Sequence, residues 1–330
     1  MALDYHRYME RAIELARNGM GMVSPNPMVG AVIVARDGTI LGEGWHRKFG
    51  LAHAEVNAFN SVKPEQEHRL AEATMFVTLE PCAHHGKTPP CADLIVEKKV
   101  KSVVVGARDP FHRVDGRGIE RLREAGIDVA VGIMEKECVE LNKTFFFAHT
   151  HGRPYVTLKW AQSADGWTDS QSMHPYRFSS PLSQTLVHRL RSLNDAIITS
   201  TATATADNPR LDTRLTPGAR TPVPVVMGRS DITKATNLRA NPRLLRFEWH
   251  DIEATLVALY REHNVTSVLV EAGPTLLQTF IDSQLWNEAR VEVNPVRLGA
   301  DGIHKAPVLP AVPHSCETIE NNTVYYYRNE

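Results

Sequence analysis

Three residues that can bind a metal lie in the first third of the chain: His53, Cys82 and Cys91. One imidazole and two thiolates suit tetrahedral zinc, and three protein ligands leave the fourth position open to water, as in catalytic zinc sites. Zinc lowers the pKa of a bound water to about 7, so such a site supplies hydroxide at neutral pH. Glu55 follows His53 by two residues, and at the start of a helix it can face that water without binding the metal. The pattern predicts a hydrolytic zinc centre in which Glu55 moves the protons.

Other cysteines and histidines leave alternatives open. His84 and His85 lie between the two zinc cysteines and are rival ligands, although a loop position favours a place beside the substrate. A structural zinc protein that binds partners is a second possibility, but it would normally have a fourth protein ligand. Cys138 and Cys316 are expected to be buried thiols. Four cysteines in 330 residues do not suggest a disulfide scaffold, so we expect a cytoplasmic protein.

Composition excludes several classes of function. Lys and Arg total 37 and Asp and Glu total 38, which gives a net charge of −1. Such a chain has no overall attraction to nucleic acid or to an anionic membrane, so any phosphate must be bound locally. Hydrophobic residues make up 42% of the chain, enough for ordinary cores, and no apolar run of membrane-spanning length is present. The expected partner is a small molecule, with no nucleic acid and no membrane.

The elements that must position the zinc residues alternate between helix and strand. Cys82 follows the end of a predicted strand, and Cys91 opens a predicted helix, whose N-terminus stabilises a thiolate. Strand and helix alternation predicts a layered α/β domain. The predicted helices cover residues 5–18, 53–61, 91–99, 118–125 and 134–148, and the predicted strands cover residues 29–35, 39–45, 75–79, 102–107 and 127–132.

A second α/β series follows a polar break with Gly and Pro at residues 149–154. We therefore expect two domains, 1–148 and 149–330. The second has no Gly-x-Gly-x-x-Gly after a strand, which is the usual dinucleotide-binding signal. Its predicted strands cover residues 155–160, 196–199, 223–227, 267–270 and 289–294, and its predicted helices cover residues 181–194 and 251–263.

The long spacing between the zinc cysteines gives the first domain a specific resemblance. Eight residues separate Cys82 from Cys91, whereas nucleic-acid and cytidine deaminases usually have about two. The run from Glu80 to Cys91, Glu-Pro-Cys-Ala-His-His-Gly-Lys-Thr-Pro-Pro-Cys, resembles the deaminase of riboflavin biosynthesis. Pro25-Asn-Pro-Met-Val-Gly30 and Gly50-Leu-Ala-His-Ala-Glu55 resemble it as well.

This resemblance implies a cytidine-deaminase-like domain of three layers. It also implies the substrate, a diaminopyrimidinone that carries a ribosylamino 5′-phosphate and is deaminated to the matching uracil. Zinc would be held by His53, Cys82 and Cys91, with Glu55 as the catalytic residue. The implied substrate contacts are Asn26, His46, His84 and Lys87. Asn26 offers a donor and an acceptor to a pyrimidine edge, and Lys87 with the histidines could hold the phosphate.

The second domain resembles the NADPH-dependent reductase of the same pathway, whose fold is similar to dihydrofolate reductase. The resemblance lies in Leu158-Lys159, Ser163-Ala-Asp-Gly166, Asp207-Asn-Pro-Arg-Leu211 and Val270-Glu-Ala-Gly-Pro-Thr-Leu276. The last run is a strand-to-helix turn in which small residues let a pyrophosphate approach a helix N-terminus. The implied substrate contacts are Arg191, Leu211, Arg214 and Glu271, and the implied cofactor contacts are Ala161, Ser179, Thr203, Asp207, Gly273, Pro274 and Thr275. Two arginines are predicted cofactor contacts on their own chemistry: Arg177 can present a flat guanidinium, and Arg229 adds a cation that could meet the 2′-phosphate of NADPH. Arg191 and Arg214 could clamp the ribose 5′-phosphate.

The resemblance as a whole implies a bifunctional enzyme that deaminates the pyrimidine and then reduces its ribosyl side chain to ribityl. The sequence departs from the family at four positions. Pro175 replaces a Ser, Arg177 a Trp and Gly228 an Asp, and in Asp109-Pro-Phe-His112 the family's Asn after the Pro is missing.

Two alternatives therefore stay open: a deaminase with a silenced or altered reductase domain, and a nucleotide or tRNA deaminase with an appended domain. The second lacks the basic face expected of a nucleic-acid reader. Homo-oligomers are possible, and the sequence does not fix the oligomeric state.

Overall fold

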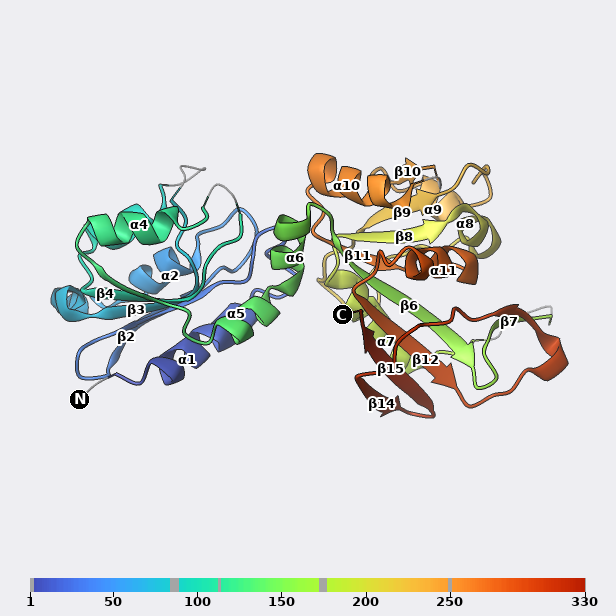
Figure 1. Cartoon of the computed structure of the whole chain (residues 1–330), viewed down its shortest axis with the longest axis horizontal. Helices are drawn as coiled ribbons and strands as arrows, with labels where there is room; N and C mark the ends of the chain where they lie inside the picture. Colours follow the sequence, from blue (N-terminus) through green and yellow to red (C-terminus); the bar gives the residue numbers. More distant parts are fainter. Residues whose placement is uncertain (1–2, 84–88, 112–113, 172–176, 249–250, 330) are drawn as a thin grey trace. The chain divides into compact units, whose positions relative to one another are not determined.

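The computed structural model describes residues 3–83, 89–111, 114–171, 177–248 and 251–329. It contains two compact units, Met1–His151 and Gly152–Glu330, which are both shown in Figure 1. Helix α6 (Lys143–His151) continues to the end of the first unit, so residues 149–151 are helical where the sequence predicts a linker.

The first unit is built on a five-stranded mixed sheet with the order β2-β1-β3-β4-β5. The strands β3, β4 and β5 are parallel, and β1 is antiparallel to both β2 and β3. Because parallel strands end at the same edge, the residues that follow β3 and β4 lie close together. The strands are β1 (Gly30–Val34), β2 (Ile40–Trp45), β3 (Thr74–Leu79), β4 (Ser102–Ala107) and β5 (Asp128–Val131).

Helices cover both faces of this sheet, which gives the predicted three layers (Figure 1). One face packs against α2 (Ala54–Asn60), α3 (Cys91–Glu97) and α4 (Arg117–Glu124), and a short 3-10 helix η1 (Pro64–Glu72) precedes β3. The other face packs against α1 (Tyr5–Arg17), α5 (Glu135–Leu141) and α6. Alternate sheet residues such as Ile33 and Val32 point into the two cores.

The single helix predicted over residues 134–148 is wrong, because the structure has two helices separated at Asn142. The buried Asn142 side chain accepts a hydrogen bond from the N–H of Met28 at 2.7 Å and donates one to the carbonyl of Met28 at 2.8 Å. These bonds tie the break to the chain just before β1, where the side chain replaces a backbone partner.

The second unit is built on an eight-stranded sheet with the order β10-β9-β8-β11-β6-β12-β15-β14. The neighbouring strands β10, β9, β8, β11, β6 and β12 are all parallel to one another. β15 pairs antiparallel with β12, and β14 pairs antiparallel with β15. Its strands are β6 (Tyr155–Ser163), β8 (Ala196–Ser200), β9 (Val223–Met227), β10 (Leu245–Phe247), β11 (Ser267–Val270), β12 (Glu288–Asn294), β14 (Ser315–Ile319) and β15 (Asn322–Arg328); β7 (Trp167–Ser170) and β13 (Gly302–Lys305) form a separate two-stranded ribbon.

Helices also cover both faces of the second sheet. α10 (Ile252–His263) and α11 (Pro274–Asp282) pack on the face that carries Leu158 and Val270. α7 (Pro181–Ser192), α8 (Thr201–Asp207) and α9 (Thr236–Arg239) lie on the face that carries Ile197 and Leu269, and η2 (Gly299–Asp301) precedes β13. The α/β class predicted for this half is confirmed.

The two cysteines outside the candidate metal site differ in burial. Cys138 is buried on α5, as predicted, but Cys316 is exposed on β14, so the prediction for Cys316 is wrong. β14 is the edge strand of its sheet, and four of its five residues are exposed. Among the described residues, no helix is long and apolar enough to cross a bilayer.

Candidate zinc centre and cofactor site

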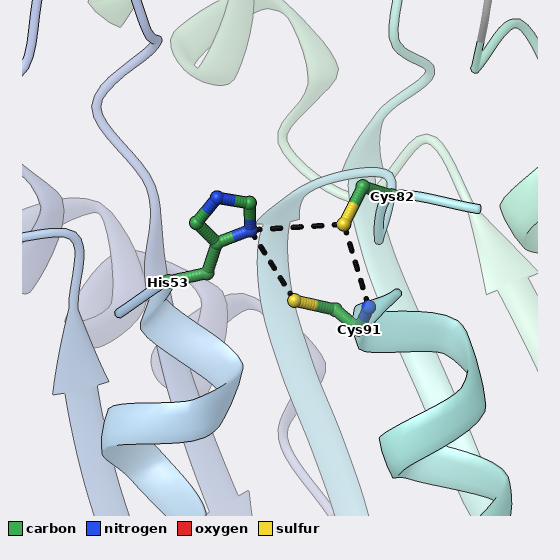
Figure 2. Close-up of side chains that lie close together, drawn as sticks. All are labelled: His53, Cys82 and Cys91. Carbon is green, nitrogen blue, oxygen red and sulfur yellow. Dashed lines mark hydrogen bonds between the residues drawn. The ribbon is translucent and has the colours of Figure 1, made fainter. Parts of the chain in front are cut away.

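The side chains of His53, Cys82 and Cys91 converge, as Figure 2 shows. The Nδ1 atom of His53 lies 3.3 Å from Sγ of Cys91 and 3.7 Å from Sγ of Cys82. Cys91 opens α3, and its backbone N–H donates to Sγ of Cys82 at 3.4 Å. The three ligand atoms all lie within 4.8 Å of one another.

These distances and donor types fit zinc. Tetrahedral bonds of about 2.0–2.3 Å place neighbouring ligand atoms roughly 3.5 Å apart, close to the separations from Nδ1 of His53 to the two sulfurs. Hydrogen bonding with Cys91 and with His53 lowers the pKa of the Cys82 thiol to about 4, despite burial. The hydrogen bond with Cys82 raises the pKa of His53 to about 9. Cys82 is therefore favoured as the thiolate that binds metal. The hydrogen bond with Cys82 and burial raise the pKa of the Cys91 thiol well above its ordinary value, so metal binding must displace a proton from Cys91 and from His53.

Helix α2 is held close to the sheet because two residues of β2 have no side chain. A Cβ on Gly42 would come within 2.4 Å of the carbonyl oxygen of Ala58, and one on Gly44 within 2.4 Å of that of Ala54. His53 is the N-cap residue of α2, so this close approach sets where its ring lies. The same contact sets the direction of Glu55, the second residue of the helix.

Glu55 is 3% exposed, in the first turn of α2. Burial raises the pKa of its carboxyl, while the nearby charge of His53 opposes that rise. A carboxyl with a raised pKa can both take and return a proton near neutral pH. The structure therefore places Glu55 beside the three candidate ligands, as the sequence predicts.

Of the four predicted substrate contacts, His46 lies against the metal cluster and Asn26 lies beside His46. The side-chain Nδ2 of Asn26 lies 3.2 Å from Nε2 of His46, and the His46 ring contacts the His53 ring edge-on at a centroid distance of 5.4 Å. Nδ1 of His46 lies 3.1 Å from the carbonyl of Ala52, which can only accept, so Nδ1 carries the proton. Burial lowers the pKa of His46, so its Nε2 accepts from the Asn26 amide. The other two predicted contacts, His84 and Lys87, lie outside the described residues.

Glu80 has a role that the sequence motif does not reveal. It is 4% exposed, and its carboxylate accepts hydrogen bonds from four backbone N–H groups on the segment that leads into α4. These donors are Asp109 at 3.3 Å, Gly116 at 3.0 Å, Gly118 at 2.9 Å and Ile119 at 3.3 Å. Glu80 thereby joins the turn that carries Cys82 to the segment after β4.

Asp109 is a second buried carboxyl at this edge of the sheet. Burial raises its pKa to about 7, and its carboxylate accepts from the N–H of Phe111 at 2.8 Å. It belongs to the stretch that departs from the family, in which His112 lies outside the described residues.

In the second unit, the predicted substrate residues Arg191 and Glu271 form a bidentate ion pair. Nε and Nη2 of Arg191 donate to the two carboxylate oxygens of Glu271 at 2.7 and 2.8 Å. Burial would raise the pKa of Glu271, but the bonds from Arg191 outweigh it and hold that pKa below its ordinary value. Arg191 also donates to the carbonyl of Asp212 at 3.2 Å, and Arg214 pairs with the Asp212 carboxylate at 2.5 Å. Leu211, next to Asp212, is buried with a φ of 50°.

The structure adds Lys159 and His188 to this region. Lys159 lies on β6 next to Arg290 of β12, and its ammonium interacts electrostatically with Glu271 and Arg191. Burial lowers the pKa of Lys159 and also that of His188, which lies on α7. Lys159 belongs to a stretch that resembles the reductase, but the sequence alone did not show that its charge is buried beside Glu271.

The predicted cofactor residues from α8 and α11 meet at Thr203. The hydroxyl of Thr203 accepts from the N–H of Gly273 at 3.0 Å, and Ser200 donates to that hydroxyl at 3.0 Å. Gly273 is the N-cap of α11 and has no side chain of its own to cap the helix, and Pro274 and Thr275 follow it. The N–H of Gly273 is taken by Thr203 and Pro274 has none, so the N–H groups of the first turn from Thr275 onward are the ones that fit the pyrophosphate of a dinucleotide. Asp207 ends α8, and burial raises its pKa.

The remaining predicted cofactor residues lie on several elements. Ala161 lies on β6, and Arg177 is exposed just before α7. Ser179 donates to Glu292, and Arg229 pairs with Glu248 at 3.3 Å with both side chains about two-thirds exposed. Pro175 lies outside the described residues.

One of the family departures has a physical reason. Gly228 has a φ of 132°, and a Cβ there would come within 2.5 Å of the Thr201 hydroxyl oxygen. An Asp in its place would require Thr201 to move.

Two family models match the chain. Residues 3–107 match the cytidine and deoxycytidylate deaminase zinc-binding region, and residues 154–309 match the RibD C-terminal domain.

Relatives and solved structures span both units. The chain is 37% identical over 331 residues to the riboflavin biosynthesis protein RibD of Escherichia coli, covering 89% of this chain and 88% of that one. The structure of RibD from Acinetobacter baumannii superposes with a TM-score of 0.87 at 32% identity, and 98% of each chain is covered. A diaminohydroxyphosphoribosylaminopyrimidine deaminase/5-amino-6-(5-phosphoribosylamino)uracil reductase from Thermotoga maritima superposes with a TM-score of 0.83 at 34% identity, again over 98% of each chain.

Proposed function

The chain belongs to the RibD family of riboflavin biosynthesis proteins, and from this premise we propose how its two units divide the work. The first unit deaminates the diaminopyrimidinone ribosylamino 5′-phosphate to the matching uracil. The second unit then reduces the ribosyl side chain of that product to ribityl. Small-molecule chemistry of this kind needs neither nucleic acid nor membrane. Location in the cytoplasm and assembly into homo-oligomers stay predictions.

One observation carries the proposal for the first unit: the convergence of His53, Cys82 and Cys91 with the buried Glu55 beside them. When bound there, zinc supplies a water activated for attack on the ring carbon. Glu55 takes the two protons of that water in turn and passes one to the ring nitrogen and the other to the leaving ammonia. Its raised pKa suits both transfers.

Asn26 orients the pyrimidine in this proposal. Its Nδ2 is held by Nε2 of His46, which leaves the amide oxygen to accept from a ring N–H or amino group. Lys87 between the zinc cysteines is proposed to bind the phosphate and to contribute little to the chemistry. A Lys87→Ala change should then raise KM far more than it lowers kcat.

In the second unit, NADPH would supply the hydride, and the start of α11 together with Thr203 would hold it. Arg191 and Arg214, which both contact Asp212, are proposed to receive the 5′-phosphate. Each Glu271 oxygen accepts one bond from Arg191 and retains a lone pair for a sugar hydroxyl. The ammonium of Lys159 interacts electrostatically with Glu271 and is proposed to contact the same sugar or the ring. Such positioning can account for several kcal/mol of the barrier.

The test is a two-stage assay with the pyrimidine phosphate as substrate. Ammonia release is measured first, and oxidation of NADPH is then followed by absorbance with the deaminated product. We expect ammonia release without NADPH, and NADPH oxidation only with the deaminated product.

Each other outcome selects a different function. Deamination with no NADPH oxidation above background would mean that the departures at Pro175, Arg177 and Gly228 have silenced the second unit. Deamination of nucleotides or tRNA in place of this pyrimidine would favour the nucleic-acid alternative. Zinc without deamination of any of these substrates would favour a structural metal site.

A further inference from the structure

A buried carboxylate on β12, that of Glu292, is not used by the proposed mechanism. It is 0% exposed and accepts hydrogen bonds from Oγ of Ser183 at 2.6 Å, Oγ of Ser179 at 2.9 Å and Nδ2 of Asn322 at 2.5 Å. The Arg290 guanidinium, itself 5% exposed as a residue, lies 3.4 Å from it. Although burial alone would raise the pKa of Glu292, these bonds outweigh burial and lower it, so the group is a carboxylate.

The donors come from one short segment and from the neighbouring strand. Ser179 lies just before α7 and Ser183 lies in its first turn, while Asn322 opens β15. The carbonyl of Phe178 is held as well, since it accepts from Asn294 at 2.9 Å and from Asn322 at 2.7 Å. Residues 178–183 are therefore fixed to β12 and β15 through both backbone and side chains.

The bond from Ser179 limits what that residue can do for a cofactor. A serine hydroxyl has one hydrogen to donate, and here it goes to Glu292. A phosphate oxygen accepts and does not donate, so Ser179 cannot bind one while it keeps this bond. The residue that resembles a cofactor ligand in sequence therefore has its hydroxyl hydrogen committed to Glu292 in the structure.

The anchored segment is the start of the helix that carries Arg191. Ser183 at one end of α7 bonds to Glu292 on β12, and Arg191 near the other end bonds to Glu271 after β11. The strand β6, which carries Lys159, lies between β11 and β12. Two carboxylates therefore hold α7 across the strand of Lys159. Glu271 holds the C-terminal end of α7, near the candidate phosphate-binding residues. Glu292 holds the N-terminal end of α7, which follows Arg177 in the chain.

A buried ion pair adds little net stability over apolar residues of the same volume, because of the cost of desolvation. What the Glu292 network adds is a fixed position for residues 178–183. Resting on the proposed reductase function, we propose that Glu292 is a positioning residue for NADPH. It sets the segment that presents Arg177 and the neighbouring backbone to the cofactor, and Ser179 transmits this role without contacting NADPH.

The test measures the dissociation constant of NADPH by calorimetry on the full-length, zinc-loaded chain. Glu292→Gln should weaken binding about fivefold to twentyfold, because the bonds of a charged acceptor are lost. The KM for the pyrimidine phosphate should change less than the KM for NADPH, and deamination by the same chains should be unchanged. The matched control is Glu288→Gln on the same strand, whose partner Arg328 is far more exposed than Arg290; it should bind NADPH like the unmodified chain.

A double-variant cycle decides the role of Ser179. Ser179→Ala should weaken NADPH binding about threefold to fivefold alone, and less than about twofold in the Glu292→Gln background, because the two residues act as a unit. An equal loss in both backgrounds would mean that Ser179 contacts NADPH directly, which overturns the proposal. Unchanged binding by Glu292→Gln overturns it as well.

A second variant keeps the test decisive if the Glu292→Gln chain does not fold. If Glu292→Gln does not fold, Ser183→Ala removes one donor and no charge, and NADPH binding equal to the unmodified chain would then overturn the proposal. Absence of NADPH binding by the unmodified chain, with deamination intact, is a different result: the proposed reductase function itself fails.

Discussion

The candidate metal site of the first unit and the candidate reductase site of the second unit differ in the sequence distance that each must close. The metal site joins His53 to residues 29 and 38 positions away, at the ends of neighbouring elements. In the second unit, Arg191 meets Glu271 across 80 positions, and Ser183 meets Glu292 across 109. The first site is a product of local spacing, and the second depends on sheet register.

This difference explains why a departure from the family sequence should disturb the metal site more than the reductase site. In the metal site, each ligand sits at an element boundary that its own local sequence defines. In the reductase site, one residue contributes to a network drawn from β6, β11, β12 and α7. If one residue of this network changes, a residue on another strand can still hold the site in place. In our proposal, Glu292 does this by fixing the segment that follows Arg177.

The largest expected effect is the loss of metal in Cys82→Ser. Removing one of three protein ligands should abolish stoichiometric zinc binding and deamination, since a serine hydroxyl is a much weaker ligand for zinc than a thiolate. Elemental analysis of the purified chain measures this, with Cys316→Ser on the exposed edge strand as the matched control. Full zinc retention in Cys82→Ser would break the assignment of the site.

Glu55→Gln should give the next largest effect, a loss of about 10²–10⁴-fold in deamination, because the proton shuttle is removed. Gln has nearly the same shape, so zinc content and NADPH oxidation with the deaminated product should both be retained. Ammonia release at neutral pH is the measurement. A loss below about tenfold would assign the proton transfer to another group.

Arg191→Met tests the long-range character of the second site. It leaves Glu271 buried without its charged partner, and breaking a buried pair costs about 3–5 kcal/mol. Denaturant unfolding should show this loss for the second unit, while deamination is retained. The double variant Arg191→Met with Glu271→Leu should regain most of the stability but not the KM for the deaminated pyrimidine. Recovery of both would show that the pair is only structural.

The smallest effect is expected at Arg229, which is proposed to meet the 2′-phosphate of NADPH. A charged hydrogen bond of this kind can contribute about 1–3 kcal/mol. Arg229 is highly exposed and already pairs with Glu248, so the low end, about 1 kcal/mol or fivefold, is expected. The measurement is the ratio of kcat/KM for NADPH over NADH in Arg229→Ala. Glu248→Gln frees Arg229 and should raise the ratio; equal ratios in all three chains would exclude Arg229.

The sequence predicts those parts of the molecule whose structure is determined by residue type and by spacing along the chain. The zinc ligands and Glu55 follow from short motifs, and the layered α/β class of the first unit follows from the alternation of strand and helix. Its three layers follow from the family resemblance. β14 and β15 were not predicted, and β14 is an exposed edge strand whose pattern lacks a buried face. The partners of Lys159 and Ser179 could not be predicted, because they depend on the register of β6 with β12, which places Lys159 beside Arg290. The break at Asn142 was missed for the same reason, since its partner Met28 lies 114 positions away.

The carboxylate of Glu80 has a consequence for how the first unit opens. Four backbone amides, from Asp109 to Ile119, share this one acceptor outside any strand ladder. None of them can be released alone without leaving a buried charge less well solvated, so the four should open together. Their hydrogen exchange should therefore be slow and cooperative, although they lie in a turn and a helix start. The turn that carries Cys82 belongs to the same opening unit, so release of the metal should loosen Asp109, Gly116, Gly118 and Ile119 in the same event.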